Sequence, residues 1–462
     1  MNIAIVVALL GSIPAPVASH STMDFIFRSS SYLIRTEFES SSNIIVDEFE
    51  EFVSRAWQAR DKRDWDEMAR NLSAAWRIRM NTGGIDRFGV GLYHALTFAY
   101  IRTGDLDLAV QSARSSLTRL TEASSLQEWI GAHLQMAEAA SLVGDFKTSS
   151  DCIRRLERHR SELGPSSNSY RDVLDRSTNK EFRFSFKYAY EQFPKEFDNG
   201  LVLAFLPRTD LPYQSASFEV VGARKYNKRQ KGEQVWLEVE PNAREPFYVR
   251  GSVKQLATSF WTDIKALKSA KALDLESSDP YLGESYGVSM SGPGADIARS
   301  LKGKSQWETI RNVARWMDEN IPYVIDGSDK FIIHANDALV HRKGVCNPRA
   351  LAAVKLMRLC GVPCRVVRGM GSFTTPPGWH TWIEIRSPIT DPGGKPRWVP
   401  TDVGSTVTDF PLHLGIQFYP SVAPFSDRAF EWEQWYPFNI ETVEYTKKKM
   451  TLPDSGEQIP AL

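Results

Sequence analysis

Three residues in the last third of the sequence have the types needed for nucleophilic acyl transfer: Cys346, His380 and Asp402. In such chemistry a cysteine thiolate attacks a carbonyl carbon, a histidine moves the proton, and a carboxylate orients the imidazole. Taken singly, each residue has an ordinary structural interpretation, as a buried thiol, a packed imidazole or a turn residue. Their order and their flanking sequences together favour a Cys-His-Asp triad.

Cys346 lies where the sequence predicts the start of a helix. Asn347 suits the cap, Pro348 suits the first helical position, and Gly361 ends the apolar run that follows. The positive end of a helix stabilises a thiolate and lowers the pKa of a thiol. The amides of the first turn could also stabilise an oxyanion.

His380 and Asp402 fall in two successive segments with the alternation of strands. His380 opens the first segment, and Asp402 ends Arg397–Asp402. A strand would hold the imidazole in a fixed place, and the carboxylate could accept a hydrogen bond from its second nitrogen. The sequence also predicts the neighbouring helices and strands, at Trp307–Glu319, Pro348–Leu359, Arg365–Arg368, Thr381–Ile385 and Trp398–Val399.

Four motifs follow one another in this region. They are Gly344-Val345-Cys346, Gly361-Val362-Pro363-Cys364-Arg365, His380-Thr381-Trp382-Ile383-Glu384 and Trp398-Val399-Pro400-Thr401-Asp402. In this order they resemble the core of the transglutaminase-like superfamily. The resemblance implies an α+β papain/transglutaminase-like domain at residues 295–425, with Cys346 as nucleophile, His380 as general acid/base and Asp402 as orienting carboxylate.

The resemblance to calcium-dependent crosslinking enzymes is weaker. Asn347 follows the cysteine where those enzymes usually have Trp, and Phe331 replaces the glycine that a calcium loop at Asp326–Asp329 would need. His334 and His341 are seven residues apart but have no third ligand in the sequence. We therefore predict no cofactor and no metal.

The N-terminal part, residues 46–165, is predicted to form helical hairpin repeats. Helix-breaking junctions recur at Asp64, Asp105 and Asp145, with amphipathic segments on both sides. The segments resemble tetratricopeptide (TPR-like) units. Such arrays hold a peptide or protein partner on a concave surface, or they pack on the next domain, and the sequence leaves both alternatives open.

Residues 180–262 are predicted to form an antiparallel β-sandwich. The expected strands are Phe182–Tyr190, Leu201–Leu206, Ser217–Val221, Val235–Glu240 and Phe247–Val253. The basic run Arg224–Lys231 is interpreted as a solvated hairpin loop between two of them.

Composition excludes some partners. The sequence has 56 Lys plus Arg and 56 Asp plus Glu, so no global field draws it to nucleic acid. Residues 1–22 resemble a signal peptide too short for a membrane span, which predicts a secreted or periplasmic protein. If translation starts at Met23, the protein is cytoplasmic. Among the other cysteines, Cys360 and Cys364 are interpreted as core residues.

The predicted function is cysteine-dependent acyl transfer or hydrolysis at amide bonds of a peptide or protein substrate. Hydrolysis and transamidation share all three residues of the triad, so the sequence does not separate them. The alternative is a catalytically silent transglutaminase-like fold that acts with the TPR-like repeats as a protein-interaction module.

Overall fold

The computed structural model describes residues 43–62, 64–81, 88–163, 181–190, 202–206, 208, 211–231, 234–242, 245, 247–256, 258–273, 278–285, 287–324, 332–371, 378–401, 416–421, 439–445, 450–451 and 458–459. The predicted signal peptide at residues 1–22 and the calcium-loop segment Asp326–Asp329 lie outside these ranges.

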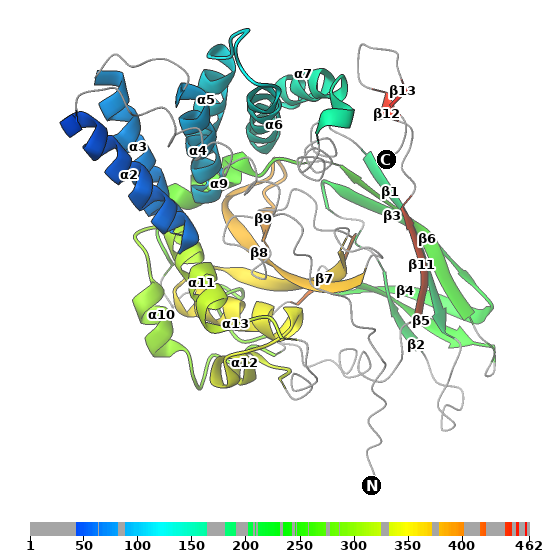
Figure 1. Ribbon diagram of the computed structural model, residues 1–462. Coiled ribbons are helices and arrows are strands. Elements are labelled where there is room, and N and C mark those ends of the chain that lie inside the picture. Colours follow the sequence, from blue (N-terminus) through cyan, green and yellow to red (C-terminus); the bar gives the residue numbers. More distant parts are fainter. Residues whose placement is uncertain are drawn as a thin grey trace.

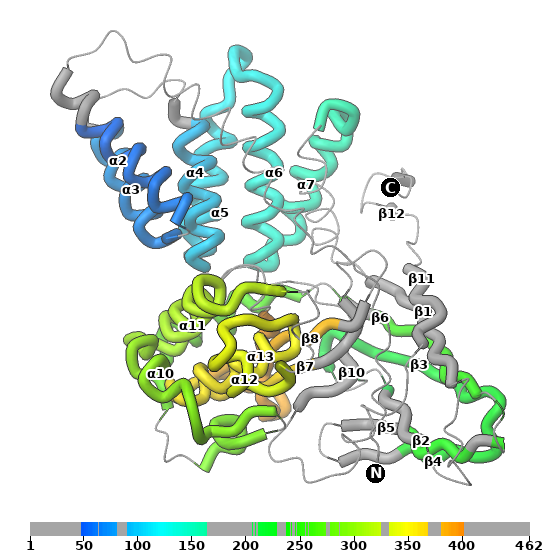
Figure 2. The backbone as a smooth tube through the Cα atoms, turned by 60° about the horizontal axis from the view of Figure 1, so that its bottom comes forward, coloured from blue at the N-terminus to red at the C-terminus, as the bar shows by residue number. Residues whose placement is uncertain are grey.

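The N-terminal region is helical, and its helices stand side by side (Figures 1 and 2). They are α2 (Asn43–Asp61), α3 (Trp65–Asn81), α4 (Phe88–Thr103), α5 (Leu106–Thr118), α6 (Leu126–Val143) and α7 (Phe146–Glu157), followed by the short 3-10 helix η1 (Arg160–Glu162). Helices α2 and α3, α4 and α5, and α6 and α7 pack as successive pairs. The predicted junctions are therefore confirmed as the turns inside these pairs.

The recurring aspartates begin the second helix of each pair. The side chains of Asp64 and Asp145 accept hydrogen bonds from backbone N–H groups in the first turns of α3 and α7, at 3.0 and 3.1 Å. Such caps satisfy donors that a helix start leaves without an acceptor. Asp105 precedes α5 but makes no such cap. Its carboxylate instead accepts from Thr103 Oγ1 at 2.6 Å and pairs with Lys268.

The middle region contains two antiparallel sheets. Their strands are β1 (Glu181–Tyr190), β2 (Val202–Phe205), β3 (Gln214–Val221), β4 (Ala223–Lys231), β5 (Gln234–Pro241), β6 (Phe247–Leu256) and β11 (Asn439–Tyr445). One sheet has the order β11-β1-β6-β3, and the other has the order β2-β5-β4. The five predicted strands are confirmed as β1, β2, β3, β5 and β6.

The basic run Arg224–Lys231 is a strand, so its interpretation as a loop is wrong. It forms β4, which pairs with β5 along its length, with Tyr226 opposite Val239 and Lys228 opposite Leu237. β4 is at the edge of its sheet, and the described side chains from Arg224 to Lys228 are exposed. Charged side chains are common on edge strands because they discourage pairing with other chains.

The C-terminal region combines helices with a four-stranded sheet of order β10-β7-β8-β9. Its elements are α9 (Trp261–Ser269), α10 (Ala295–Leu301), α11 (Gln306–Asn320), α12 (Ala335–His341), α13 (Cys346–Leu359), β7 (Cys364–Gly371), β8 (Gly378–Thr390), β9 (Pro396–Thr401) and β10 (Ile416–Ser421). A further two-stranded sheet pairs β12 (Met450–Thr451) with β13 (Gln458–Ile459). Helix α13 packs against β7, β8, α11 and α12, so it lies at the centre of this region (Figure 1).

The end of α13 is confirmed at Gly361. This glycine has a φ of 81°, its N–H donates to Arg358 O, and the next N–H, of Val362, donates to Met357 O. The two bonds are those of a Schellman motif, which favours glycine at the left-handed position. A side chain here would also meet the carbonyl oxygen of Leu273, 2.1 Å from an ideal Cβ.

The turns of the helical pairs rest on the C-terminal region. Trp307 Nε1 of α11 donates to Thr103 O at 3.3 Å, and its ring lies against Gly104, where a Cβ would come within 2.5 Å. Ser259 Oγ donates at 2.6 Å to the carbonyl oxygen of Leu142, in the last turn of α6. Of the two alternatives for the helical region, packing on a neighbouring region is thus observed.

Within the described ranges, no helix combines the length and the apolar character that a membrane crossing requires.

Candidate active site

Cys346 is the first residue of α13, so the helix begins two residues earlier than the sequence predicts. Val345, with φ −87° and ψ −171°, occupies the cap position without a side-chain cap bond. Asn347 and Pro348 are therefore the second and third helical residues, and the prediction of Asn347 as cap is wrong. Proline is tolerated in the first turn because the N–H it lacks would have no acceptor within the helix. The thiol thus lies inside the positive end of the helix.

Two contacts fix the chain around Cys346. Gly344 pairs with Tyr323 in a parallel bridge, which holds the approach to α13 in extended conformation. Arg349, in the first turn of α13, lies over the Tyr323 ring and pairs with Asp318 of α11 at 3.5 Å. Both partners of this ion pair are largely buried, so the start of α13 is tied to a rigid neighbour.

Cys346 differs in exposure from the other three cysteines, and all four lie in the described ranges. Cys346 is half-buried, whereas Cys152, Cys360 and Cys364 are buried. Burial raises the pKa of Cys152 and of Cys360 to about 11 and that of Cys364 to about 12. Such thiols stay protonated and inert at neutral pH. The interpretation of Cys360 and Cys364 as core residues is confirmed.

His380 is the third residue of β8, at a point where the strand is paired. It lies opposite Gly369 of β7, and its ring is half-buried. The rings of His380 and Trp382 lie nearly parallel, with centroids 6.4 Å apart. His380 and Trp382 thus lie on the same face of β8, two residues apart.

The two faces of β8 have different partners. Ile383 and Ile385 belong to the core that also contains the buried side chains of α13. His380, Trp382 and Glu384 alternate with them and therefore lie on the other face. The α13 body thus packs behind the strand that carries His380, and Trp382 and Glu384 are fully buried on the histidine's own face.

A buried ion pair lies on that face, two residues beyond Trp382. Arg365 is directly opposite Glu384 in the β7–β8 register, and its Nε donates to Glu384 Oε2 at 2.8 Å. Neither side chain is exposed. The guanidinium lies 3.7 Å from the centre of the Trp398 ring. A cation in such a place is stable only while its carboxylate partner remains.

The middle region completes this network. Tyr213, just before β3, donates its hydroxyl to Glu384 Oε1 at 3.3 Å. Burial and the nearby Glu384 carboxylate raise the pKa of Tyr213 well above its usual value, so the hydroxyl keeps its proton. Sequence reasoning assigned no role to Tyr213, Arg365 or Glu384, although Arg365 and Glu384 stand in two of the four motifs. The available signal was the presence of two oppositely charged residues, Arg365 and Glu384, in two segments predicted to be largely apolar strands.

Asp402, the third predicted triad residue, lies outside the described residues. It directly follows Thr401, the last residue of β9, which lies opposite Ile383 of β8. The structure packs α13, which begins with Cys346, on the Ile383 face of β8, the strand that carries His380. It does not describe the third residue.

No group of three or more His, Cys, Asp or Glu side chains suited to a metal ion occurs in the described ranges. His334 and His341 lie at the two ends of α12 and are both exposed.

Comparisons with known proteins bear on the same region. Residues 295–403 match the model of the Transglutaminase-like superfamily. The UPF0252 protein PF0978 of Pyrococcus furiosus is 32% identical over 62 residues, which are 13% of this chain and 19% of that protein. The match thus spans about a fifth of the relative's length.

Two solved structures were also found. A candidate cysteine protease from Cytophaga hutchinsonii has a TM-score of 0.40 and 17% identity, over 52% of this chain and 81% of that chain. A candidate protease from Parabacteroides distasonis has a TM-score of 0.19 and 10% identity, over 47% and 57%. Both TM-scores are below 0.5. The family match, together with the order of motifs around Cys346 and His380, shows that residues 295–403 form a transglutaminase-like core domain.

Proposed function

We propose that the chain is a cysteine-dependent enzyme that transfers or hydrolyses the acyl group of an amide bond in a peptide or protein. The observation that carries the proposal is the placement of Cys346. It is the one cysteine of the four, all within the described ranges, that is not buried, and it begins a central helix. A helix N-terminus and partial exposure are the setting of reactive thiols.

In the proposed reaction the Cys346 thiolate attacks the amide carbonyl carbon, and a carbon–sulfur bond forms. The amides of the first turn of α13 stabilise the oxyanion. Protonated His380 donates its proton to the leaving nitrogen, and the carbon–nitrogen bond breaks to leave a thioester. Water or an amine then attacks the thioester carbon and gives a proton to His380. The carbon–sulfur bond breaks, and Cys346 leaves as the thiolate. Asp402 would hold the imidazole in the tautomer that this sequence of steps needs.

The proposal predicts selective alkylation of Cys346. With limiting iodoacetamide at neutral pH, Cys346 should react at least about tenfold faster than Cys360, because each unit of pKa lowering gives about ten times more thiolate. Peptide mapping by mass spectrometry measures both rates in one sample. Equal rates at the two cysteines would contradict the proposal.

Turnover gives the second readout. A peptide and glycopeptide library, read by mass spectrometry with and without an added amine, distinguishes hydrolysis from amine incorporation. Cys346→Ala should abolish every product, whereas Cys152→Ala, in α7, should retain them. A library that yields no product with the wild-type chain would instead favour the catalytically silent interaction module.

The finer architecture is also a proposal. We propose that the three helix pairs are TPR-like units and that the two middle sheets face each other as an antiparallel sandwich. The inside-pair turns, recurring about every 40 residues at Asp64, Asp105 and Asp145, support the first. The antiparallel pairing within each sheet supports the second. We further propose export of the chain, supported by the apolar segment within residues 1–22.

A further inference from the structure

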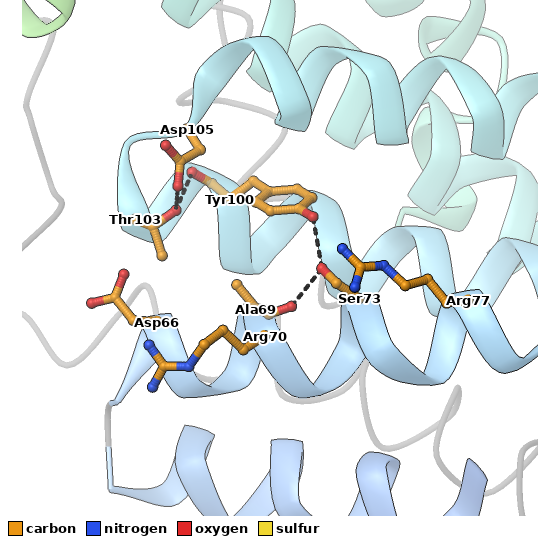
Figure 3. A pocket seen from close by; sticks show the side chains of 8 residues that line it. All are labelled: Asp66, Ala69, Arg70, Ser73, Arg77, Tyr100, Thr103 and Asp105. Carbon is orange, nitrogen blue, oxygen red and sulfur yellow. Dashed lines mark hydrogen bonds between the residues drawn. The ribbon is translucent and has the colours of Figure 1, made fainter. Parts of the chain in front are cut away.

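A cavity of about 460 Å³ lies between α3 and α4, and Cys346 is not among its lining residues (Figure 3). Arg70, Ser73 and Arg77 of α3 line one wall, and Tyr100 of α4 lines the other. The three α3 residues are three and four positions apart, so they share one face of the helix. This volume is in the range of sites that hold a ligand or a short peptide segment.

Arg70 and Arg77 supply positive charge to this cavity. Both side chains are exposed, and across the described part of the chain neither forms an ion pair or a hydrogen bond. An arginine carries several N–H donors and never loses its charge at ordinary pH. Two such groups on one helix face attract an anion with two acceptor groups.

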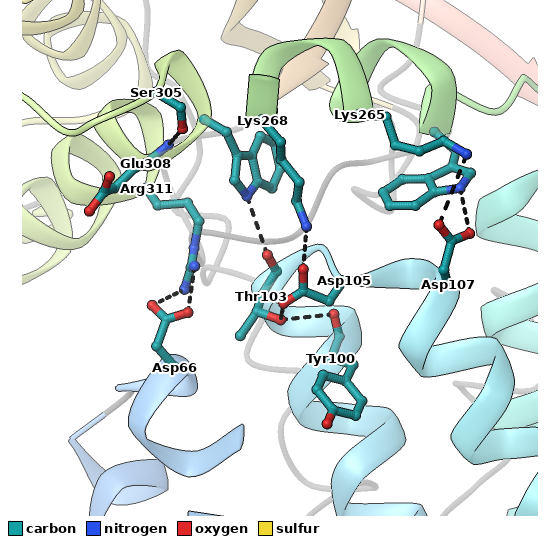
Figure 4. Close-up of polar contacts among 12 residues, drawn as sticks. Asp66, Tyr100, Thr103, Asp105, Asp107, Lys265, Lys268, Ser305, Glu308 and Arg311 are labelled. Atoms are coloured by element: carbon teal, nitrogen blue, oxygen red, sulfur yellow. Dashed lines mark hydrogen bonds and ion pairs between the residues drawn. The ribbon is translucent and has the colours of Figure 1, made fainter. Parts of the chain in front are cut away.

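The carboxylates that also line the cavity do not cancel this charge. Asp66 is held by Arg311 of α11 at 2.7 Å, and Asp105 is held by Lys268 of α9 (Figure 4). Arg315 lies 3.6 Å from Asp66 as well. The cations of the C-terminal region therefore neutralise the acidic wall, and the charge that remains is positive.

The hydroxyl groups of Ser73 and Tyr100, which line the cavity, already form hydrogen bonds within the protein. Ser73 Oγ donates to Ala69 O at 2.7 Å, and the Ser73 and Tyr100 hydroxyl oxygens are 2.8 Å apart. Because the Ser73 proton is used, Tyr100 is the donor in this second bond. This fixes the Tyr100 ring as a flat apolar wall and leaves the two guanidinium groups as the donors for a ligand.

The spacing of the arginines indicates the form of the ligand. Seven helical residues separate Arg70 from Arg77, which is about 10 Å along the helix axis. An extended chain covers about 10 Å in three residues. We propose that this cavity binds an extended acidic segment of a protein partner, with two carboxylates three residues apart on Arg70 and Arg77. This inference goes beyond the proposed function and holds whether or not Cys346 is catalytic.

The test uses isothermal titration calorimetry on the full chain at low salt. The probe is an amidated seven-residue peptide with glutamate at its second and fifth positions and Gly or Ser elsewhere. The peptide should bind with one-to-one stoichiometry, and added salt should weaken it. Arg70→Ala and Arg77→Ala should each weaken binding by about fivefold or more, since each loses one charge-assisted contact. Arg114→Ala, which removes an exposed arginine of α5 outside the cavity, is the matched control.

Three outcomes would overturn the proposal. One is equal affinity of Arg70→Ala, Arg77→Ala and Arg114→Ala. Another is equal binding of a peptide with glutamine in place of both glutamates. The third is equal or tighter binding of suberate, a dicarboxylate of similar span, which would make the cavity a small-molecule site. Circular dichroism of each variant, with R70Q and R77Q as milder replacements, separates loss of binding from loss of helix.

Discussion

Replacement of Glu384 by Gln tests whether the buried network on the histidine face of β8 stabilises the sheet. Arg365 and Glu384 are both fully buried, and the substitution leaves the guanidinium without a counter-charge. Breaking a buried ion pair from one side typically costs about 3–5 kcal/mol. The lower end applies, because glutamine keeps one acceptor oxygen, for either Arg365 or Tyr213. We expect the loss to be about 3 kcal/mol.

Hydrogen exchange read by mass spectrometry is the assay. A loss of about 3 kcal/mol should speed exchange of the paired amides of β7 and β8 by about a hundredfold, provided that these amides exchange through opening of the sheet. Because exchange is read peptide by peptide, the helical region serves as an internal reference that should not change.

Glu219→Gln is the matched control. Glu219 and Arg250 are also directly opposite each other, on β3 and β6, but their side chains are 59% and 56% exposed. An exposed pair contributes about 1 kcal/mol or less, so exchange in β3 and β6 should rise less than about fivefold. If Glu384→Gln speeds amide exchange in β8 no more than Glu219→Gln speeds it in β3, the buried ion pair does not stabilise the sheet.

Two further predictions concern the backbone and pH. Gly361→Ala should lower the free energy of unfolding by at least about 2 kcal/mol more than Gly394→Ala. Both glycines have positive φ, but a Cβ at Gly361 would meet Leu273 O at 2.1 Å, whereas a Cβ at Gly394 meets nothing within 4 Å; equal losses in urea denaturation would argue against this clash. Burial lowers the pKa of His94 from 6.5 to about 4. Between these values the unfolded chain binds the extra proton, so stability is full above pH 6.5 and falls by about 3 kcal/mol as the pH drops to 4. Urea midpoints at neutral pH and just above pH 4 should therefore differ less in His94→Gln than in the wild-type chain, and an unchanged difference would exclude His94 as the cause.

Local signals predicted most of the elements near the candidate site. The left-handed turn at Gly361 follows from a glycine placed between an apolar helix and a proline, and the Schellman bonds confirm it. Alternation predicted the strand at His380 because its two faces differ in chemistry: Ile383 and Ile385 face the apolar core, and Glu384 faces the buried ion pair. The predicted start of α13 was two residues late, because Gly344 pairs with Tyr323 and sets where the extended chain ends. Local sequence patterns do not show which two separate segments of the chain will pair in this way.

Contacts between distant segments explain the other differences. The basic run Arg224–Lys231 looks like a loop because most of its side chains need water, yet its backbone pairs with β5. Strand β11 completes a sheet whose other strands come from the middle region, more than 180 residues earlier. Backbone pairing depends little on side-chain type at an exposed edge. Composition therefore carries no signal for either pairing.

Helix α11 links the helical region to the helix that carries Cys346. Its Arg311 holds Asp66, which lines the cavity between α3 and α4, and its Asp318 holds Arg349 in the first turn of α13. Arg311 and Asp318 are about two helical turns apart, and α11 also packs on α13. One helix therefore carries ion pairs to both α3 and the first turn of α13.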